Sequence, residues 1–289
     1  MFKRAVITDE ISQDLSQALK IMQRFELEGV ELRSVWEKNP HEWDKEQLNQ
    51  IKSKIAAAGM QTCCLAAPVF KCKLGNEAEY QQHLNILERS MEVANELGAN
   101  LVRGFTFWDN GRFDEALPEI VEKIGATESL LQKNGITLVI ESDPATAANS
   151  SQRLERVLQQ IASPNIKALW DPGNNLYVPD AEQPFPEGYE RLKSYIGHIH
   201  VKDVSHDPLS GAAEACSFGK GEVGFANVFT RLKADQYNGW LSLETHYRIR
   251  GALSEDLLAL PKGSAFSIGG AEATSEALEN WDRILRSLR

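Results

Sequence analysis

Cysteine is scarce in this chain, with four residues in 289, at positions 63, 64, 72 and 216. None of them forms a CxxC pair, and the neighbours Cys63 and Cys64 would point to opposite faces of a strand. This usage excludes the dense disulfide framework of small secreted domains. We therefore expect reduced thiols and a cytoplasmic protein.

Long apolar runs and a basic surplus are also missing. The start, MFKRAVITDE, lacks the apolar segment of a signal peptide, and no run approaches the roughly 20 apolar residues of a membrane helix. Lysine and arginine number 31 against 41 acidic residues, which gives a net charge of −10. Because phosphate neutralisation supplies most nucleic-acid affinity, the acidic charge leads us to expect no nucleic-acid partner. Without a long apolar run, we also expect no membrane partner.

One pattern recurs along the chain: a helix-like segment ends at a glycine and a short apolar strand follows at once. It appears at Gly29 (GVELRS), Gly59 (GMQTCCLAA), Gly98 (GANLVRGFTF), Gly135 (GITLVIES) and Gly239 (GWLSLETH). Glycine is the usual left-handed cap after a helix. The first four glycines lie 30, 39 and 37 residues apart (59−29, 98−59, 135−98), close to the length of a βα unit. The pattern predicts a parallel sheet with helical connections.

The pattern predicts eight strands, and eight βα units favour a closed barrel over an open doubly wound sheet. The expected ranges are 4–8, 29–33, 60–66, 100–105, 136–141, 166–171, 196–202 and 239–244. The length of 289 residues is near the roughly 250 of one such barrel. No GxGxxG follows the first strand, so the dinucleotide-binding alternative lacks its fingerprint. We expect one (β/α)₈ TIM-barrel domain over residues 1–289.

Two helices and one long loop can be placed in advance. Asn76 with Glu79 forms a capping-box arrangement, and Pro118 suits the first turn of a second helix. The longest irregular stretch is 248–272, after the eighth strand. A loop of this length is usually functional, so it could serve as a lid or as a contact in a homo-oligomer.

Ligand-type side chains end four strands in succession. The fifth strand ends at Glu141, the sixth at Asp171 and the eighth at Glu244, while the seventh carries His200 with Lys202 two residues on. The carboxyl ends of barrel strands meet at one rim. Three carboxylates at one place need a counter-charge, and a divalent cation is the simplest. Oxygen-rich donors with one nitrogen suit Mn²⁺, Mg²⁺ or Co²⁺, with Zn²⁺ left open.

Each of these residues alone has an ordinary structural explanation. A carboxylate at a strand end is most often a helix cap or a surface charge, and His198 is more often a packed barrel histidine than a ligand. Four such strand ends in a row favour the metal site. If Glu141 and Glu244 flank a substrate, one could remove a proton α to a carbonyl while the other returns it.

The motifs ES, WDPGN, HIHVKD and SLETH, with FGKGEVGFANVFTRLKADQYNGW between the last two, resemble the sugar phosphate isomerase/epimerase family of xylose isomerase-like TIM barrels. The resemblance covers nearly the whole chain, and its second half is the specific part. It implies that Glu141, Asp171, His200 and Glu244 bind one divalent ion. It also implies that the two glutamates are the acid/base pair of a sugar isomerase or epimerase.

Two positions depart from the ketose epimerases of that family. Asn174 stands where they carry a substrate-binding histidine, and His206 where they carry an arginine. Both fall on substrate contacts, so a keto-sugar or inosose dehydratase that begins with the same proton abstraction stays open. Arg33 could bind a substrate anion or pair with Glu31 or Asp9, and we expect Lys202 to contact substrate. These residues make the predicted substrate-binding set: Asn174, Lys202, His206 and Arg33.

Other features bear on the substrate and on rival functions. Phe70, Phe105, Phe107 and Trp108 could wall a sugar pocket or simply pack, and without a phosphate-binding loop we expect an unphosphorylated, sugar-like small molecule. An endonuclease IV-like nuclease needs more strand-end histidines than the six in this chain provide. A non-catalytic sugar-binding protein would not need both glutamates.

Overall fold

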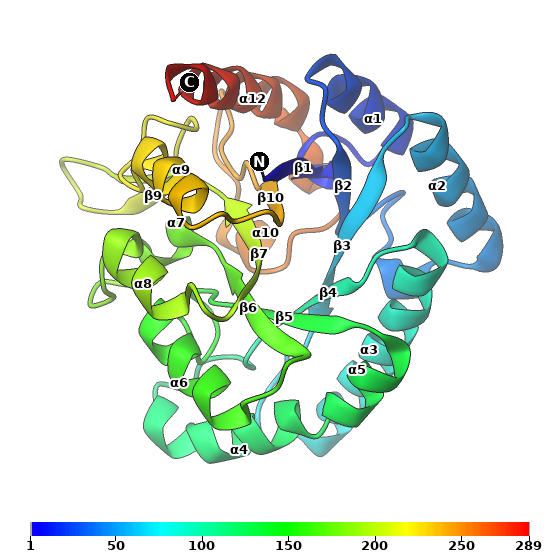
Figure 1. The fold of residues 1–289 in the computed structure, drawn as a ribbon, viewed down its shortest axis with the longest axis vertical. Coiled ribbons are helices and arrows are strands. Elements are labelled where there is room, and N and C mark those ends of the chain that lie inside the picture. The colour runs from blue at the N-terminus through cyan, green and yellow to red at the C-terminus, as the bar shows by residue number, and fades with distance from the viewer. Residues whose placement is uncertain (1, 289) are drawn as a thin grey trace. The chain divides into compact units, whose positions relative to one another are not determined.

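The computed structural model describes residues 2–288. Eight parallel strands follow one another in the order β1-β10-β7-β6-β5-β4-β3-β2, which is the order of a closed barrel (Figure 1). The strands are β1 (Lys3–Ile7), β2 (Gly29–Leu32), β3 (Gln61–Val69), β4 (Leu101–Gly104), β5 (Thr137–Glu141), β6 (Ile166–Trp170), β7 (Ile196–Val201) and β10 (Trp240–Leu243). The expected (β/α)₈ barrel is confirmed.

Close contacts group the chain into two compact units. The first unit combines Met1–Thr62 with His200–Arg289, and the second is Cys63–Ile199. The sequence-based expectation of one domain stays a prediction. None of the described helices is both long and apolar enough to cross a membrane.

In the first unit, β1 pairs in parallel with both β10 and β2, so that Val6 lies level with Leu243 and with Val30. Figure 1 shows α12 beside α1 and α9, in agreement with the contacts between these helices. The helices of this unit are η1 (Thr8–Glu10), α1 (Leu15–Arg24), η2 (Pro40–Glu42), α2 (Lys45–Ala57), α9 (Phe225–Ala234), α10 (Glu255–Ala259), α11 (Gly263–Ser267) and α12 (Gly270–Ser287).

In the second unit, β4 pairs with β5 and β5 with β6, and Glu141 at the end of β5 lies level with Leu169. All four cysteines of the chain are free thiols. The helices of this unit are α3 (Glu77–Leu97), α4 (Phe113–Gly125), α5 (Glu128–Asn134), α6 (Ser151–Ile161), α7 (Pro172–Asn175), η3 (Pro184–Gly188) and α8 (Tyr189–Leu192).

Local signals fix the ends of several helices. The Asn76 side chain accepts a hydrogen bond from the backbone N–H of Glu79 and so caps α3, as predicted. The reciprocal bond of a capping box is replaced, because Glu79 accepts from the backbone N–H of Lys73 and from the Asn76 amide. Gly98 ends the same helix with a φ of 72°, and Gly135 ends α5 with a φ of 65°. Both values lie in the left-handed region, where glycine carries no Cβ penalty, so strands β4 and β5 can begin at once.

The prediction for α4 was wrong about its start. Pro118 does not open the helix but lies inside it, because Phe113, Ala116 and Leu117 extend the buried face toward the N-terminus. The proline removes the hydrogen bond that would reach the carbonyl of Asp114. Asp114 is exposed, so water can replace that bond.

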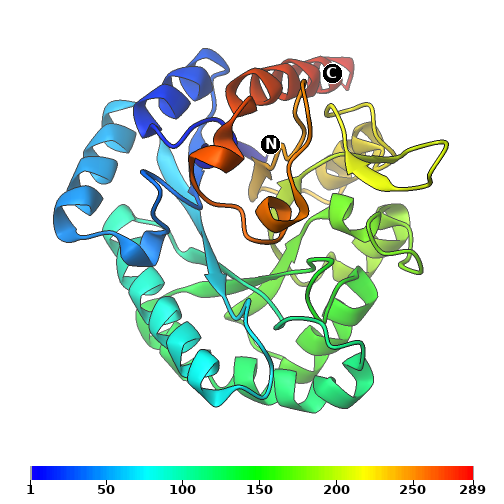
Figure 2. The same ribbon diagram turned by 180° about the vertical axis from the view of Figure 1, so that it is seen from behind.

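The stretch 248–272 is not irregular throughout, which corrects the loop prediction. It contains α10, α11 and the first turn of α12, and Figure 2 shows this segment in orange, running across the start of the chain. Tertiary contacts that sequence patterns do not report hold it: Ser267 Oγ donates to the carbonyl of Asp9 at 2.7 Å. The antiparallel hairpin of β8 (Val204–His206) and β9 (Ala213–Ala215) was also not predicted.

Candidate active site

Four buried ligand-type side chains occupy the ends of β5, β6, β7 and β10. Glu141, Asp171, His200 and Glu244 are each exposed by 2% or less. Glu141 and Asp171 belong to the second unit, and His200 and Glu244 belong to the first. All four are of the residue types that bind divalent ions, and we call them the candidate cluster. Strand order explains this group, because the carboxyl ends of barrel strands face the same side.

His200 is oriented by a second carboxylate. Its Nε2 lies 3.1 Å from Oε1 of Glu31, which is fully buried on β2, and its Nδ1 lies 3.7 Å from Oε2 of Glu244. A carboxylate on one ring nitrogen fixes the tautomer and the direction of the other nitrogen, as in many metal-binding histidines. In this geometry Nδ1 is the nitrogen that could serve as a ligand.

Asp171 follows β6 and caps α7. Its Oδ1 accepts a hydrogen bond of 2.9 Å from the backbone N–H of Gly173, and Pro172 occupies the first helical position. The motif WDPGN therefore has a structural reason, because an aspartate cap followed by proline starts a helix directly after a strand. This cap fixes the carboxylate at the strand end.

Both carboxylate oxygens of Glu141 receive donors within the second unit. Asn174 Nδ2 donates to Oε1 at 3.0 Å and also to the carbonyl of Ser142 at 3.0 Å. Arg103 Nη1 donates to Oε2 at 3.1 Å from β4. Asn174, predicted as a substrate contact, thus lies against one of the two predicted acid/base residues.

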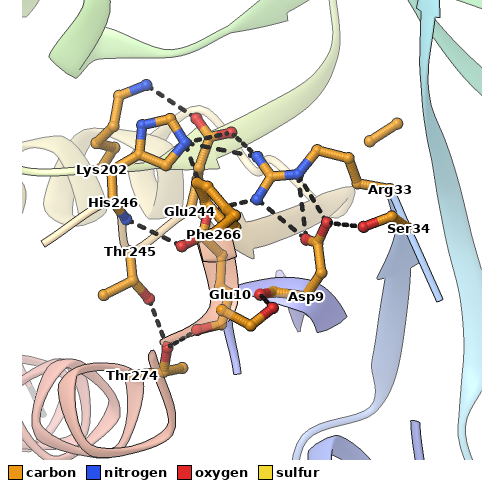
Figure 3. A network of polar contacts seen from close by, with 12 residues as sticks. Asp9, Glu10, Arg33, Ser34, Lys202, Glu244, Thr245, His246, Phe266 and Thr274 are labelled. Carbon is orange, nitrogen blue, oxygen red and sulfur yellow. Dashed lines mark hydrogen bonds and ion pairs between the residues drawn. The ribbon is translucent and has the colours of Figure 1, made fainter. Parts of the chain in front are cut away.

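Glu244 is held in the same manner from the first unit. Arg33 Nη1 donates to its Oε1 at 2.9 Å, and Lys202 Nζ donates to its Oε2 at 2.8 Å (Figure 3). Burial alone would raise the pKa of Glu244. The charges of Lys202 and His246 and the contact with His200 outweigh burial, so the pKa lies well below its ordinary value.

The Arg33 side chain is paired with acidic residues on several sides. The sequence suggested that Arg33 could pair with Asp9, and this pair is present. Nη2 of Arg33 lies 3.0 Å from Oδ1 of Asp9. Nη2 also lies 2.7 Å from Oε1 of Glu10. Burial opposes the charge of Arg33, but Asp9, Glu10 and Glu244 outweigh it and raise the guanidinium pKa. Whether Arg33 also contacts substrate stays a prediction.

His206 has different surroundings from the other predicted substrate contacts. It lies on the short strand β8 of the hairpin, is exposed, and its Nδ1 lies 3.0 Å from Oε2 of Glu222. Its backbone N–H donates to the other oxygen of Glu222 at 2.7 Å. Both contacts are with Glu222, and substrate binding by His206 stays a prediction.

The loops after β3, β4 and β5 carry a lysine with aromatic neighbours, which sequence reasoning missed. Lys71 Nζ donates to Asp143 Oδ2 at 2.8 Å and lies 4.4 Å from the ring centroid of Phe105 and 5.5 Å from that of Trp108. Phe105 is almost completely buried, while Trp108 is partly exposed. Of the two rings, Trp108 is therefore the better placed to meet a ligand.

Of the other members of the polar site, the sequence suggested Asp9 as a partner of Arg33, whereas Glu10, Arg103 and His246 were not identified. Asp9 and Glu10 follow β1, Arg103 lies on β4, and His246 follows Glu244 by two residues. Burial lowers the pKa of His246 to about 3 despite the charges of Glu244 and Glu10. The rule that functional residues gather at strand ends would have found Asp9 and Glu10 if it had been applied to the first strand as well.

Comparison with known proteins places the chain in a family. A family model described as xylose isomerase-like TIM barrel matches residues 19–286. The chain belongs to the xylose isomerase-like TIM barrel family. The match spans seven of the eight barrel strands, all but β1. It includes the strand ends that carry the candidate cluster.

The chain is similar in sequence to a dehydratase and to an epimerase. The chain is 22% identical over 223 residues to inosose dehydratase of Geobacillus kaustophilus, covering 67% of this chain and 70% of the relative. It is 24% identical over 208 residues to the L-ribulose-5-phosphate 3-epimerase UlaE of Salmonella paratyphi C, covering 68% and 69%. The crystal structure of the IOLI protein with a bound zinc atom superimposes with a TM-score of 0.75 at 14% identity, covering 99% of both chains.

Proposed function

We propose that this member of the xylose isomerase-like family is a divalent-metal-dependent isomerase or epimerase of a small, unphosphorylated keto-sugar or related polyol. Glu141, Asp171, His200 and Glu244 hold the ion, and the two glutamates move the proton. The observation that carries the proposal is the burial of these four ligand-type side chains at the ends of four barrel strands.

The donor set fits a divalent ion. Three carboxylates and one imidazole, all buried, would repel one another without a cation, and oxygen-rich sets of this kind suit Mn²⁺, Mg²⁺ or Co²⁺. Zn²⁺ remains a candidate, since the IOLI structure contains a zinc atom. The hydrogen bond that His200 donates to Glu31 supplies the support that metal-binding histidines usually have.

The reaction that suits these residues is proton transfer next to a carbonyl. A bound divalent ion polarises the substrate carbonyl and offsets the negative charge that develops on its oxygen. One of Glu141 and Glu244 takes the proton from the neighbouring carbon, and the other returns a proton. If the second proton reaches the opposite face of that carbon, its configuration is inverted.

The neighbours of the two glutamates orient them for this task. Asn174 and Arg103 donate to Glu141, while Lys202 and Arg33 donate to Glu244, so each carboxylate has a fixed plane. In the proposed complex, the Lys202 ammonium and the Asn174 amide also donate to substrate hydroxyl or carbonyl oxygens. Fixed geometry of this kind contributes to rate because reacting groups are held in place.

The test is a substrate panel with metal-loaded protein. Keto-pentoses, keto-hexoses, their phosphates and inosose are incubated with protein loaded with Mn²⁺, Mg²⁺, Co²⁺ or Zn²⁺, and products are identified by proton NMR. The proposal expects an epimer or isomer of an unphosphorylated keto-sugar. Turnover restricted to phosphorylated sugars, or equal turnover in metal-free protein, would contradict it.

A dehydratase is the second candidate, and the similarity to inosose dehydratase favours it. Elimination of water begins with the same removal of an α-proton, and it then needs a donor to the leaving hydroxyl. Asn174 and His206 replace the substrate contacts of the ketose epimerases, which is consistent with a different substrate. A product that has lost water in the same NMR panel would select this alternative.

A further inference from the structure

The guanidinium group of Arg33 lies among several carboxylates of the first unit. Nη2 lies 3.0 Å from Asp9 Oδ1 and 2.7 Å from Glu10 Oε1, and Nη1 lies 2.9 Å from Glu244 Oε1 (Figure 3). Arg33 is 1% exposed. The Arg33 guanidinium therefore contacts three buried carboxylates. Glu244 also pairs with Lys202, and Arg248 Nη1 lies 3.6 Å from Glu10 Oε2.

The same place carries the donor set of a metal site. Ligand atoms of Glu10, Glu244 and His246 lie within 4.8 Å of one another. His246 Nε2 is 3.4 Å from Glu10 Oε1 and 3.4 Å from Glu244 Oε1. Two carboxylates and an imidazole on three sides are a common ligand set for divalent transition metals.

Arg33 approaches each member of this set. In addition to the contacts with Glu10 and Glu244, its Nη1 is 3.5 Å from His246 Nε2. The guanidinium group thus touches the atoms that would face a cation, and it supplies the positive charge that those atoms require. An arginine remains protonated under all ordinary conditions, so this charge is permanent.

The position of the guanidinium group is fixed by further contacts. Its Nε donates to Asp9 Oδ1 at 3.1 Å, and Ser34 Oγ donates to Asp9 Oδ2 at 2.5 Å. The ring of Phe266, from α11, lies 4.5 Å from the guanidinium carbon. Cation–π contact and the fork of donors leave the side chain little freedom.

We infer that Arg33 takes the place of a second divalent cation and acts as a positioning residue that holds Glu244 toward the first. As an internal cation it closes the Glu10–Glu244–His246 group to metal, so the site binds one ion rather than two. This inference rests on the proposed function for the first ion. It adds a role for Glu10 and His246, which the proposed reaction does not use, and a second role for Arg33.

The experiment counts ions. Metal-free wild type, Arg33→Met, Arg33→Lys and Arg103→Met are titrated with Mn²⁺ by calorimetry, and bound metal is measured after desalting. Methionine removes the charge while keeping a long side chain, lysine keeps the charge, and Arg103→Met removes a buried guanidinium from Glu141 instead. We expect one ion in wild type, Arg33→Lys and Arg103→Met, and two in Arg33→Met.

A thermal melt of each protein with and without 1 mM Mn²⁺ covers the case in which Arg33→Met folds poorly. Since a cation can replace the lost charge, Mn²⁺ should restore its folding or raise its melting temperature more than that of wild type. An ion count in folded Arg33→Met no higher than in wild type, a count in Arg33→Lys or Arg103→Met higher than in wild type, or no rescue of an unfolded Arg33→Met would each overturn the inference.

The two claims fail separately in this design. The number of ions in the wild type tests the proposed function, because a wild type that binds none has no metal site at Glu141, Asp171, His200 and Glu244. The difference between Arg33→Met and wild type tests the inference, whatever the wild-type count is.

Discussion

At the scale of single residues, the two proposed proton-transfer groups share one arrangement. Glu141 has an arginine on one carboxylate oxygen and an amide on the other, and Glu244 has an arginine and a lysine. Charge-assisted hydrogen bonds of this kind fix the plane of a carboxylate. Because the donors differ, the two glutamates are not interchangeable.

Replacing either glutamate by glutamine tests their role. Glu141→Gln and Glu244→Gln should each lower turnover by about 10²–10⁴-fold, because an amide cannot take up the proton. The variants should remain folded, since glutamine keeps the size and one acceptor oxygen, and circular dichroism checks this. Either variant retaining near-normal turnover would remove its glutamate from the mechanism.

Glu31 provides a second test, through the histidine ligand. Glu31→Gln weakens the hold on His200 Nε2, and loss of such support typically lowers metal affinity about 10–100-fold. Calorimetric titration with Mn²⁺ measures the change. Glu28→Gln is the matched control. Glu28 is an exposed glutamate three residues before Glu31, and its variant should bind metal like wild type. Equal affinities for both variants would contradict the role assigned to Glu31.

The proposed metal ligands could be chosen from the sequence, whereas their supporting residues could not. Glu141, Asp171, His200 and Glu244 end predicted strands, and strand ends meet in any barrel of this kind. The partner of Arg33 is decided by tertiary packing, because Glu244 lies 211 positions away. No local pattern reports such a pair, so the sequence left Arg33 with several possible roles.

At the scale of elements, the sequence placed all eight barrel strands, with ends that differ by at most three residues. The expected left-handed glycine is present at Gly59, Gly98 and Gly135, whereas Gly29 and Gly239 lack a positive φ and that part of the prediction was wrong. Predictions failed where tertiary contacts rather than local signals decide. Pro118 is tolerated inside α4 because its lost hydrogen bond faces solvent, and α11 is held by Asp9 through Ser267. The hairpin of β8 and β9 was missed because its strands have three residues each.

The segment after β9 gives a prediction at this scale. The buried carboxylate of Asp203 accepts hydrogen bonds from the backbone N–H groups of Gly219 at 2.8 Å and Gly221 at 2.9 Å. Asp203→Ala leaves these donors without their acceptor and should lower the free energy of unfolding by about 1–3 kcal/mol, measured with urea.

Asp207→Ala is the control for this measurement. Asp207 also accepts from backbone N–H groups, those of Leu209 and Ser210, but it is partly exposed, so water can replace the lost acceptor. We expect the control to change stability by less than about 1 kcal/mol. A larger effect at Asp207 than at Asp203 would show that the loop does not depend on the buried carboxylate.

At the scale of the whole molecule, an acidic protein concentrates negative charge at the strand ends. The net charge is −10, and the candidate cluster contains three of the acidic residues, all of them buried. A bound divalent ion should therefore stabilise the fold as well as the reaction. A ligand at 100 times its dissociation constant adds about 2.7 kcal/mol.

Removing the ion tests this coupling. A chelator should lower the melting temperature of metal-loaded protein, and added Mn²⁺ or Mg²⁺ should restore it, as followed by circular dichroism. Asp171→Asn, with one cluster carboxylate removed, should show a smaller difference between the two states. An unchanged melting temperature in the wild type would argue against a resident ion.

The most direct measurement of the central claim is exchange of the substrate α-proton with deuterated water. It is followed by proton NMR with chelator-treated wild type, with wild type reloaded with Mn²⁺, and with Asp171→Asn under the same reloading. The account predicts exchange in the reloaded wild type and little in the other two samples. Equal exchange in all three samples would contradict a reaction centred on one ion held by Glu141, Asp171, His200 and Glu244.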